Sequence, residues 1–146
     1  MIKIEFPKEK PRIRKTNDVN EIFDTIRKKW LVLTPEEWVR QNIILFLLFQ
    51  KKYPSTLISV EKEIKLADLK KRYDIVVFDR QMLPWMIIEC KEMNVQLSEK
   101  TLDQVLRYHI SIPSKYLIIT NGSHCFGFEK NEGRFVETNV FPDFKI

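Results

Sequence analysis

Two carboxylates and a lysine lie on neighbouring predicted strands of this sequence. Asp74 stands within one apolar run, and Glu89 and Lys91 stand within the next. Because side chains alternate along a strand, Glu89 and Lys91 lie on the same face. Two carboxylates can bind Mg²⁺, and a lysine beside them can orient a water or stabilise charge on a phosphate. The residue types therefore favour hydrolysis of a phosphodiester bond.

A hairpin between the two runs would bring Asp74 next to Glu89. If Asp79 at the end of the first strand faces Pro84 at the start of the second, Asp74 falls opposite Glu89. Directly opposed side chains have Cβ atoms about 4.5–5.5 Å apart, where like charges are destabilising. A divalent cation, helped by Lys91, would offset the two charges. A shift of one residue would instead turn Asp74 to the other face.

A plainer interpretation of these residues stays open. An exposed hairpin with an ordinary cluster of Asp, Lys and Glu would show the same pattern, and Asp79 is a competing acid at the turn. The tripeptide Glu-x-Lys also occurs at Glu63–Lys65, but no Asp-bearing strand precedes that copy. The elements around the hairpin must therefore be considered.

Helix signals occur in three places. Thr34 as a cap, with proline after it and Glu37 at the capping-box position, predicts a largely apolar helix that runs to about Lys52. Ser98 begins another helix with one apolar stripe. Segment 19–29, with Asn17 or Asp18 as its cap, is expected to form a short helix.

Strands are predicted by alternation and by runs rich in Ile and Val. Alternation over 57–66 predicts a half-exposed strand, and runs 73–78 and 84–91 predict the hairpin. A strand is expected at 116–120 before the Asn121-Gly122 turn, with edge strands at 125–128 and 135–140. The central order is helix, three strands, helix, strand (αβββαβ), which indicates a mixed α/β (α+β) fold.

Composition indicates an ordinary globular domain with a basic surface. The chain has 146 residues, of which 44% are hydrophobic, enough for one core. Residues 1–18 are expected to form a basic N-terminal arm, and residues 19–146 a single domain. The net charge of +5 favours a polyanionic partner such as nucleic acid. Neither a signal-peptide pattern nor a bilayer-length apolar run is seen, so we expect a cytoplasmic protein without a membrane partner.

Six segments of the chain form a more specific pattern than the triad alone. They are Thr34-Pro-Glu-Glu-Trp-Val-Arg-Gln41, Val60-Glu-Lys62, Arg72-Tyr-Asp-Ile-Val-Val-Phe-Asp79, Trp85-Met-Ile-Ile-Glu-Cys-Lys91, Leu102-Asp-Gln-Val-Leu-Arg-Tyr108 and Tyr116-Leu-Ile-Ile-Thr-Asn-Gly122. In this order they resemble the N-terminal nuclease domain of type I restriction enzyme R subunits, a branch of the PD-(D/E)xK nuclease superfamily. Tyr73 stands where the superfamily name has proline. The resemblance implies a restriction-endonuclease-like mixed central β-sheet flanked by helices.

The resemblance also implies roles for individual residues. Asp74 and Glu89 would be ligands of Mg²⁺ (or Mn²⁺), and Lys91 would be the catalytic lysine. Glu37 matches an acidic residue that can approach the metal or its waters, and Gln104 matches a glutamine on the helix after the catalytic strand. Each of these two has a plainer alternative, since Glu37 could cap its helix and Gln104 could be a solvated residue.

Four other polar or aromatic residues attract attention, but none is given a catalytic role. Arg40 is expected to form structural ion pairs. Tyr108 could stack on a base or pack beneath the site, and packing is favoured. His109 lies on the apolar stripe of its helix and is expected in the core, while His124 has no metal-binding partners nearby in the sequence.

We therefore expect a Mg²⁺-dependent endonuclease-like domain that acts on DNA. The alternatives are a non-catalytic nucleic-acid-binding or interaction module that keeps the nuclease fold, and a structural partner of another restriction or repair protein. R subunits also contain an ATP-driven motor, and the sequence has no Gly-x₄-Gly-Lys-Ser/Thr phosphate loop. A motor or specificity subunit would then act in trans.

Overall fold

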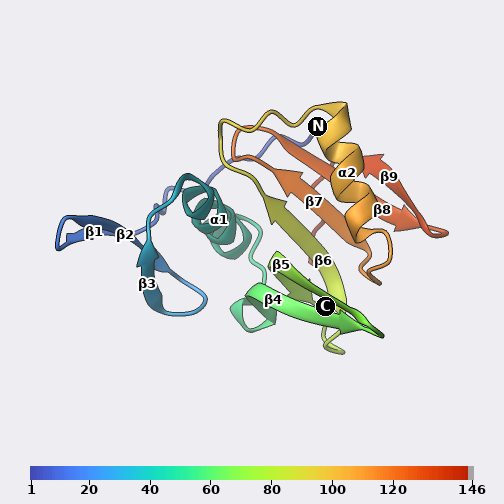
Figure 1. The fold of residues 1–146 in the computed structure, drawn as a ribbon, viewed down its shortest axis with the longest axis horizontal. Helices are drawn as coiled ribbons and strands as arrows, with labels where there is room; N and C mark the ends of the chain where they lie inside the picture. The colour runs from blue at the N-terminus through green and yellow to red at the C-terminus, as the bar shows by residue number, and fades with distance from the viewer. Residues whose placement is uncertain (145–146) are drawn as a thin grey trace.

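A computed structural model describes residues 1–144, which are built around a six-stranded sheet (Figure 1). The elements run in the order β1 (Ile13–Thr16), β2 (Val19–Asp24), β3 (Lys29–Val32), α1 (Pro35–Leu45), the π-helix η1 (Phe46–Gln50), the 3₁₀ helix η2 (Ser55–Leu57), β4 (Ile58–Leu66), β5 (Leu69–Phe78), β6 (Pro84–Cys90), α2 (Glu99–His109), β7 (Tyr116–Thr120), β8 (Cys125–Asn131) and β9 (Arg134–Thr138). From α1 to β7 this is the predicted αβββαβ order. The two further strands predicted after it are present as β8 and β9, but only β9 lies at an edge of the sheet, because β8 pairs with both β7 and β9.

The large sheet is mixed. Its strand order is β4-β5-β6-β7-β8-β9, and all neighbours are antiparallel except β6 and β7, which are parallel. A parallel neighbour requires a crossover connection, and α2 supplies it. The carboxyl end of β6, where Glu89 and Cys90 lie, is consequently next to the end of β7 and the loop that leads to α2.

Helices cover both faces of this sheet, as expected. Buried residues of α1 and η1 pack with Ile75, Val77 and Ile88 on one face. Side chains of α2 pack against Val76 and Ile87 and their neighbours on the other face, where Figure 1 shows α2 in front of the sheet. The alternation of apolar residues along β5 and β6 therefore fills two cores. Within residues 1–144, no helix is long and apolar enough to cross a membrane.

The helix predicted over segment 19–29 is wrong. Val19–Asp24 is strand β2, which lies between β1 and β3 in a separate three-stranded antiparallel sheet. Asn17 and Asp18, taken as helix caps, form the two-residue connection between β1 and β2, with φ angles of 50° and 65°. Asn and Asp tolerate this left-handed conformation, which tight hairpin turns require. Asn and Asp, which are also common helix caps, thus form a hairpin turn here and do not start a helix.

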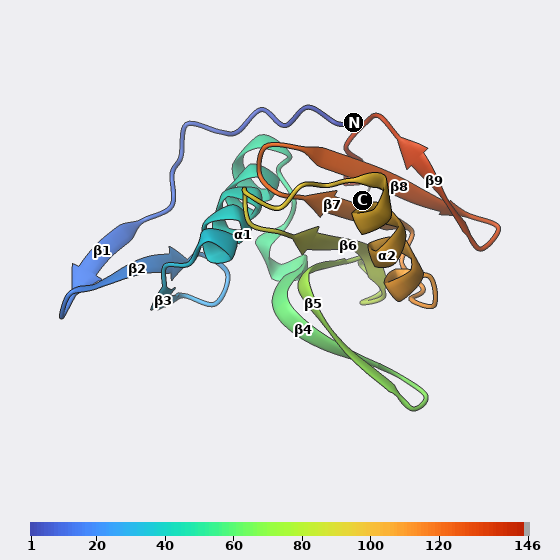
Figure 2. The ribbon, with the colours of Figure 1, turned by 45° about the horizontal axis from the view of Figure 1, so that its top comes forward.

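The first residues of the chain lie along the main core. The amide of Ile2 donates to the carbonyl of Cys125 at 2.8 Å, and the Ile2 side chain is 6% exposed. Ile4 and Phe6 pack against the same cluster. The segment expected as a basic arm therefore contains a packed stretch and the edge strand β1, and the small sheet projects beside α1 (Figure 2).

Candidate active site

The register of β5 against β6 places Asp74 beside Glu89. Ile75 pairs with Ile88, so Asp74 and Glu89 are the next residues along the two strands. The backbone amide of Cys90 donates to Asp74 Oδ2 at 2.8 Å. Where the backbone pairing of β5 and β6 ends, the Asp74 side chain accepts the next hydrogen bond from β6. This bond fixes the Asp74 carboxylate between the two strands.

The hairpin begins differently from the prediction. Phe78, and not Asp79, faces Pro84, and a register shift near the end of β5 restores the predicted pairing farther along. Asp79 Oδ1 accepts hydrogen bonds from the amides of Gln81 at 2.8 Å and Leu83 at 3.0 Å. The competing acid thus caps the turn, at the opposite end of the hairpin from Asp74.

Glu89 is buried next to the charge of Asp74. Burial, and then Asp74, raise the pKa of the Glu89 carboxyl to about 9, although Lys91 opposes this shift. Near neutral pH the two carboxyls therefore hold a proton between them in the protein alone. The charge of Asp74 disfavours ionisation of Glu89, in line with the predicted repulsion between the two acids, and a bound cation would reduce the need for that proton.

Arg40 of α1 approaches Asp74 from the face of the sheet that α1 covers, opposite the face covered by α2. Its guanidinium is 3.4 Å from Asp74 Oδ1, 2.9 Å from Glu37 Oε1 and 3.1 Å from Glu61 Oε1. Burial lowers the pKa of Arg40, but the three carboxylates outweigh burial and raise it overall, so the side chain stays charged. The structural pairing expected of Arg40 is confirmed.

Glu37 contributes to the helix cap only through its backbone. Its amide donates to Thr34 Oγ1 at 3.0 Å, which is the predicted cap. Its buried carboxylate does not turn back to the cap but accepts from Arg40 and from Gln41 Nε2, the latter at 3.1 Å. Glu37 is therefore linked to Asp74 through Arg40.

Glu61 is a site residue that the sequence reasoning did not select. On β4 it stands between Val60, which pairs with Ile75, and Lys62, so the register puts it across from Asp74. Its φ angle is 52°, an uncommon conformation for a residue with a side chain. Counting the register of β4 against β5, as was done for β5 against β6, could have identified it.

Three arginines surround the Glu61 carboxylate. Arg27, from the connection between β2 and β3, lies 3.0 Å from Oε2, Arg72 lies 3.3 Å from Oε2, and Arg40 contacts Oε1. Burial raises the pKa of Glu61, but Arg40 and Arg27 lower it more. Glu61 therefore stays ionised and joins the small sheet to the large one.

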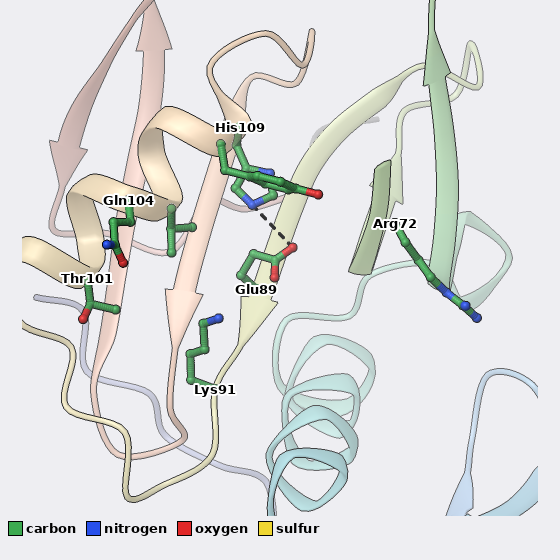
Figure 3. Close-up of a pocket in the computed structure, with 8 residues that line it drawn as sticks. Arg72, Glu89, Lys91, Thr101, Gln104 and His109 are labelled. Carbon is green, nitrogen blue, oxygen red and sulfur yellow. Dashed lines mark ion pairs between the residues drawn. The ribbon is translucent and has the colours of Figure 1, made fainter. Parts of the chain in front are cut away.

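A pocket of about 380 Å³ opens on the α2 side of the sheet, next to Glu89 and Lys91 (Figure 3). Thr101 and Gln104 reach its wall from α2, and Gln104 is exposed. Tyr108 also lines the pocket and is 48% exposed, so the prediction that it is packed beneath the site is wrong. The pocket gives a solvent-borne substrate access to Glu89 and Lys91.

His109 is buried, as its position on the apolar stripe predicted, but it also borders the site. Its Nε2 lies 3.5 Å from Glu89 Oε1 (Figure 3). Burial, with a smaller contribution from nearby lysines such as Lys71, lowers the pKa of His109 to about 4. At neutral pH this contact therefore joins two uncharged groups. The periodicity of α2 predicted that His109 faces the core, but it could not show that His109 lies next to Glu89.

The carboxylate pair fits a hard divalent cation. Among residues 1–144, no three His, Cys, Asp or Glu side chains are grouped to hold a metal, and Glu37 and Glu61 pair with Arg40. Mg²⁺ usually takes only one or two carboxylates and keeps several waters. Asp74 and Glu89 supply such oxygen donors, and a cation bound between them would oppose the effects of burial and of the Asp74 charge, which raise the pKa of Glu89.

Comparison with known proteins gives one family. The model of the family described as "Type I restriction enzyme R protein N terminus" matches residues 35–142. The matched range begins at α1 and includes Asp74, Glu89, Lys91 and Gln104, whereas the sheet β1–β3 lies outside it. A search of curated proteins finds no match.

Proposed function

The chain belongs to the family of type I restriction enzyme R protein N termini, and on that premise we propose that it is a Mg²⁺-dependent endonuclease domain that hydrolyses DNA phosphodiester bonds. One observation carries this proposal. Asp74, Glu89 and Lys91 lie together where β5 and β6 end their pairing, next to an open pocket. This arrangement of two acids and a lysine supports the resemblance to the PD-(D/E)xK superfamily that the sequence implied.

Asp74 and Glu89 would hold Mg²⁺ or Mn²⁺. The ion, when bound, supplies Lewis-acid stabilisation of the phosphate and a more acidic water. Lys91 acts as the catalytic lysine, because its ammonium can stabilise charge that develops on the phosphate or orient the attacking water. The side chains of Thr101 and Gln104 line the same pocket and can donate hydrogen bonds to a phosphate oxygen.

Arg40 and Glu37 act as positioning residues. Arg40 contacts Asp74 at 3.4 Å, and Glu37 holds the guanidinium at 2.9 Å. Because all three groups are at least half buried, this chain of contacts limits the movement of the Asp74 carboxylate. Glu37 is thus assigned a supporting role, because it reaches the predicted metal ligand Asp74 only through Arg40.

The alternative is a DNA-binding module that does not cut. The contact between Arg40 and Asp74 favours it, since a resident guanidinium already supplies part of the charge that a metal would supply. In either case, the partners that we propose are DNA and, for translocation, a motor or specificity subunit in trans, in the cytoplasm.

Cleavage of supercoiled and linear DNA tests the proposal. With Mg²⁺ or Mn²⁺ we expect cutting that EDTA abolishes, and Asp74→Asn and Lys91→Ala should each slow it about 10²-fold or more. Asp79→Asn is the matched control, because Asp79 caps the distant turn. DNA binding without cutting under every metal condition would support the non-catalytic module instead.

A further inference from the structure

The positive charge of the chain is concentrated in two segments. Residues 1–34 contain nine Lys and Arg against five Asp and Glu, and residues 62–72 contain five against two. The rest of the chain has eleven against thirteen and is slightly acidic. The basic character noted from the whole sequence is therefore local.

The first basic segment includes a face of the small sheet with arginines stacked on aromatic rings. The Arg14 guanidinium lies 4.2 Å from the ring centroid of Trp30, and that of Arg12 lies 4.8 Å from that of Phe23. Both arginines are exposed, whereas Phe23 and Trp30 are half-buried beneath them. Stacking orients each guanidinium. Arg14 Nε donates to Glu21 at 2.9 Å, so the terminal N–H groups of Arg14 are the donors that can reach phosphate oxygens.

The small sheet is fastened to the catalytic region. Asp24 is fully buried and pairs with Arg27 at 2.7 Å, and Arg27 in turn pairs with Glu61 at 3.0 Å. Ile22 is also fully buried. Glu61 on β4 lies opposite Asp74 on β5. A ligand held by Arg12 and Arg14 would therefore have a fixed position relative to Asp74.

The second basic segment is the projecting end of the β4–β5 hairpin. Lys62 and Lys65 on β4 are exposed, and Lys70 and Arg72 on β5 are exposed as well. Figure 2 shows this hairpin and the small sheet extending from the molecule with α1 between them. The two basic segments therefore stand on either side of α1, the helix that carries Arg40.

We propose that these two projections form a clamp on duplex DNA, with the basic face of the small sheet and the end of the β4–β5 hairpin gripping phosphates on either side of the cleavage site. This inference rests on the proposed function for the choice of DNA. The small sheet lies outside the family match, so the clamp would combine a matched hairpin with an element of this chain. The contacts are to the phosphate backbone and are independent of base sequence.

The salt dependence of binding tests the clamp. The affinity of the full chain for a fluorescent duplex would be measured by anisotropy in EDTA, over a range of salt concentrations. Arg12→Gln/Arg14→Gln and Lys62→Gln/Lys65→Gln should each weaken binding about tenfold or more at low salt. Each should also reduce the slope of log K against log salt by about 1–2, because each lysine or arginine on a phosphate contributes about 1. Lys115→Gln/Arg134→Gln, which removes two exposed charges elsewhere, should change little.

Two further variants separate folding and catalysis from the clamp. Arg12→Lys/Arg14→Lys keeps the charges and should keep most of the salt slope, which loss of the sheet would not allow. Asp74→Asn should bind DNA with the wild-type slope, so absent cleavage leaves the clamp standing. Two results would overturn the clamp even in a protein that cuts DNA. One is a wild-type salt slope in both Arg12→Gln/Arg14→Gln and Lys62→Gln/Lys65→Gln. The other is a loss of affinity and slope in Lys115→Gln/Arg134→Gln that equals the loss in those two variants.

Discussion

Arg40 is the residue that connects helix α1 to the acids of β4 and β5. Its side chain is 5% exposed and contacts four carboxylates, those of Glu36, Glu37, Glu61 and Asp74. Burying a guanidinium is unfavourable on its own, and the same holds for each acid, so the stability of the group depends on all partners being present. Removing one partner should therefore cost far more than the loss of a surface ion pair.

Arg40→Met tests this dependence. It removes the cation that Glu37 and Asp74 share, while Glu61 keeps Arg27 and Arg72, so the free energy of unfolding should fall by about 3 kcal/mol. Mg²⁺ should restore part of the loss, because it supplies a countercharge to Asp74. Urea denaturation with and without Mg²⁺ measures both effects, with exposed Arg80→Met as the control. A loss below about 1 kcal/mol would show that the group is not a coupled unit.

Glu89 gives a pH dependence of stability with a definite sign. Its pKa is raised to about 9 in the folded chain from an ordinary value of 4.5, so between these values the folded state holds the extra proton. Stability from this group is therefore complete below pH 4.5 and is lost as pH rises towards 9. His109, with a lowered pKa, has the opposite effect, but only below its ordinary value of 6.5.

In the window above neutral pH, the comparison with Glu89→Gln isolates Glu89, because the buried thiols of Cys90 and Cys125, whose pKa values are also raised, are present in both proteins. Between about pH 7 and 9, wild type should lose stability relative to Glu89→Gln, which has no proton to release. Saturating Mg²⁺ should abolish this difference in slope, because the ion replaces the proton between the carboxyls. Thermal denaturation across the window measures it, and parallel curves for the two proteins without metal would contradict the assigned pKa.

The sequence could predict the positions of Asp74, Glu89 and Lys91 because they depend on local strand alternation and one hairpin. Arg40, Glu61 and His109 depend on how α1, β4 and α2 pack against that hairpin. Their positions follow from tertiary contacts that periodicity does not encode. The predicted chemical roles of Glu37 and Gln104 stay predictions.

At the scale of elements, the turn at Asn17 and Asp18 shows how local signals can be ambiguous. These residue types cap helices but also adopt the left-handed conformations of a two-residue hairpin turn. Val19, Ile22 and Phe23 then favour a strand, because β-branched and aromatic side chains prefer sheets. The strands β4 to β9 were easier to predict, since long apolar runs and the Asn121-Gly122 turn gave consistent signals.

Asp18→Gly tests the hairpin directly. Glycine adopts the φ of 65° seen at this position without strain, so the hairpin should gain about 0.5–1 kcal/mol. Hydrogen exchange of the β1 and β2 amides should slow accordingly, whereas Asp18→Val should speed it. Equal exchange in the glycine and valine variants would argue against the turn.

At the scale of the whole molecule, the N-terminal residues complete a core that lies mostly in later elements. Ile2 packs in the cluster that contains Ile118 and Cys125, and its Cδ1 lies where a side chain on Gly127 would be. Composition suggested only a basic arm here, because charges dominate the segment. The apolar residues at positions 2, 4 and 6 were the available signal for an inward face.

Ile2→Ala should destabilise the whole molecule. Removing this buried side chain leaves a cavity beside β8, and the loss in free energy of unfolding should be about 2 kcal/mol. Lys3→Ala, at the exposed neighbour, is the control and should change stability by less than about 0.5 kcal/mol. Chemical denaturation of the full chain compares them, and similar values would show that residues 1–6 are not part of the core.

Titration of Mn²⁺ into the full chain by calorimetry, at about pH 7.5 in two buffers of different ionisation enthalpy, tests the central claim most directly. We predict a single ion per chain, bound by Asp74 and Glu89, with release of about one proton from Glu89. Asp74→Asn should lose this binding and Asp79→Asn should keep it. Mn²⁺ binding that is unchanged in Asp74→Asn, or absent from the wild-type chain, would contradict the assignment of these carboxylates as a metal-dependent nuclease site.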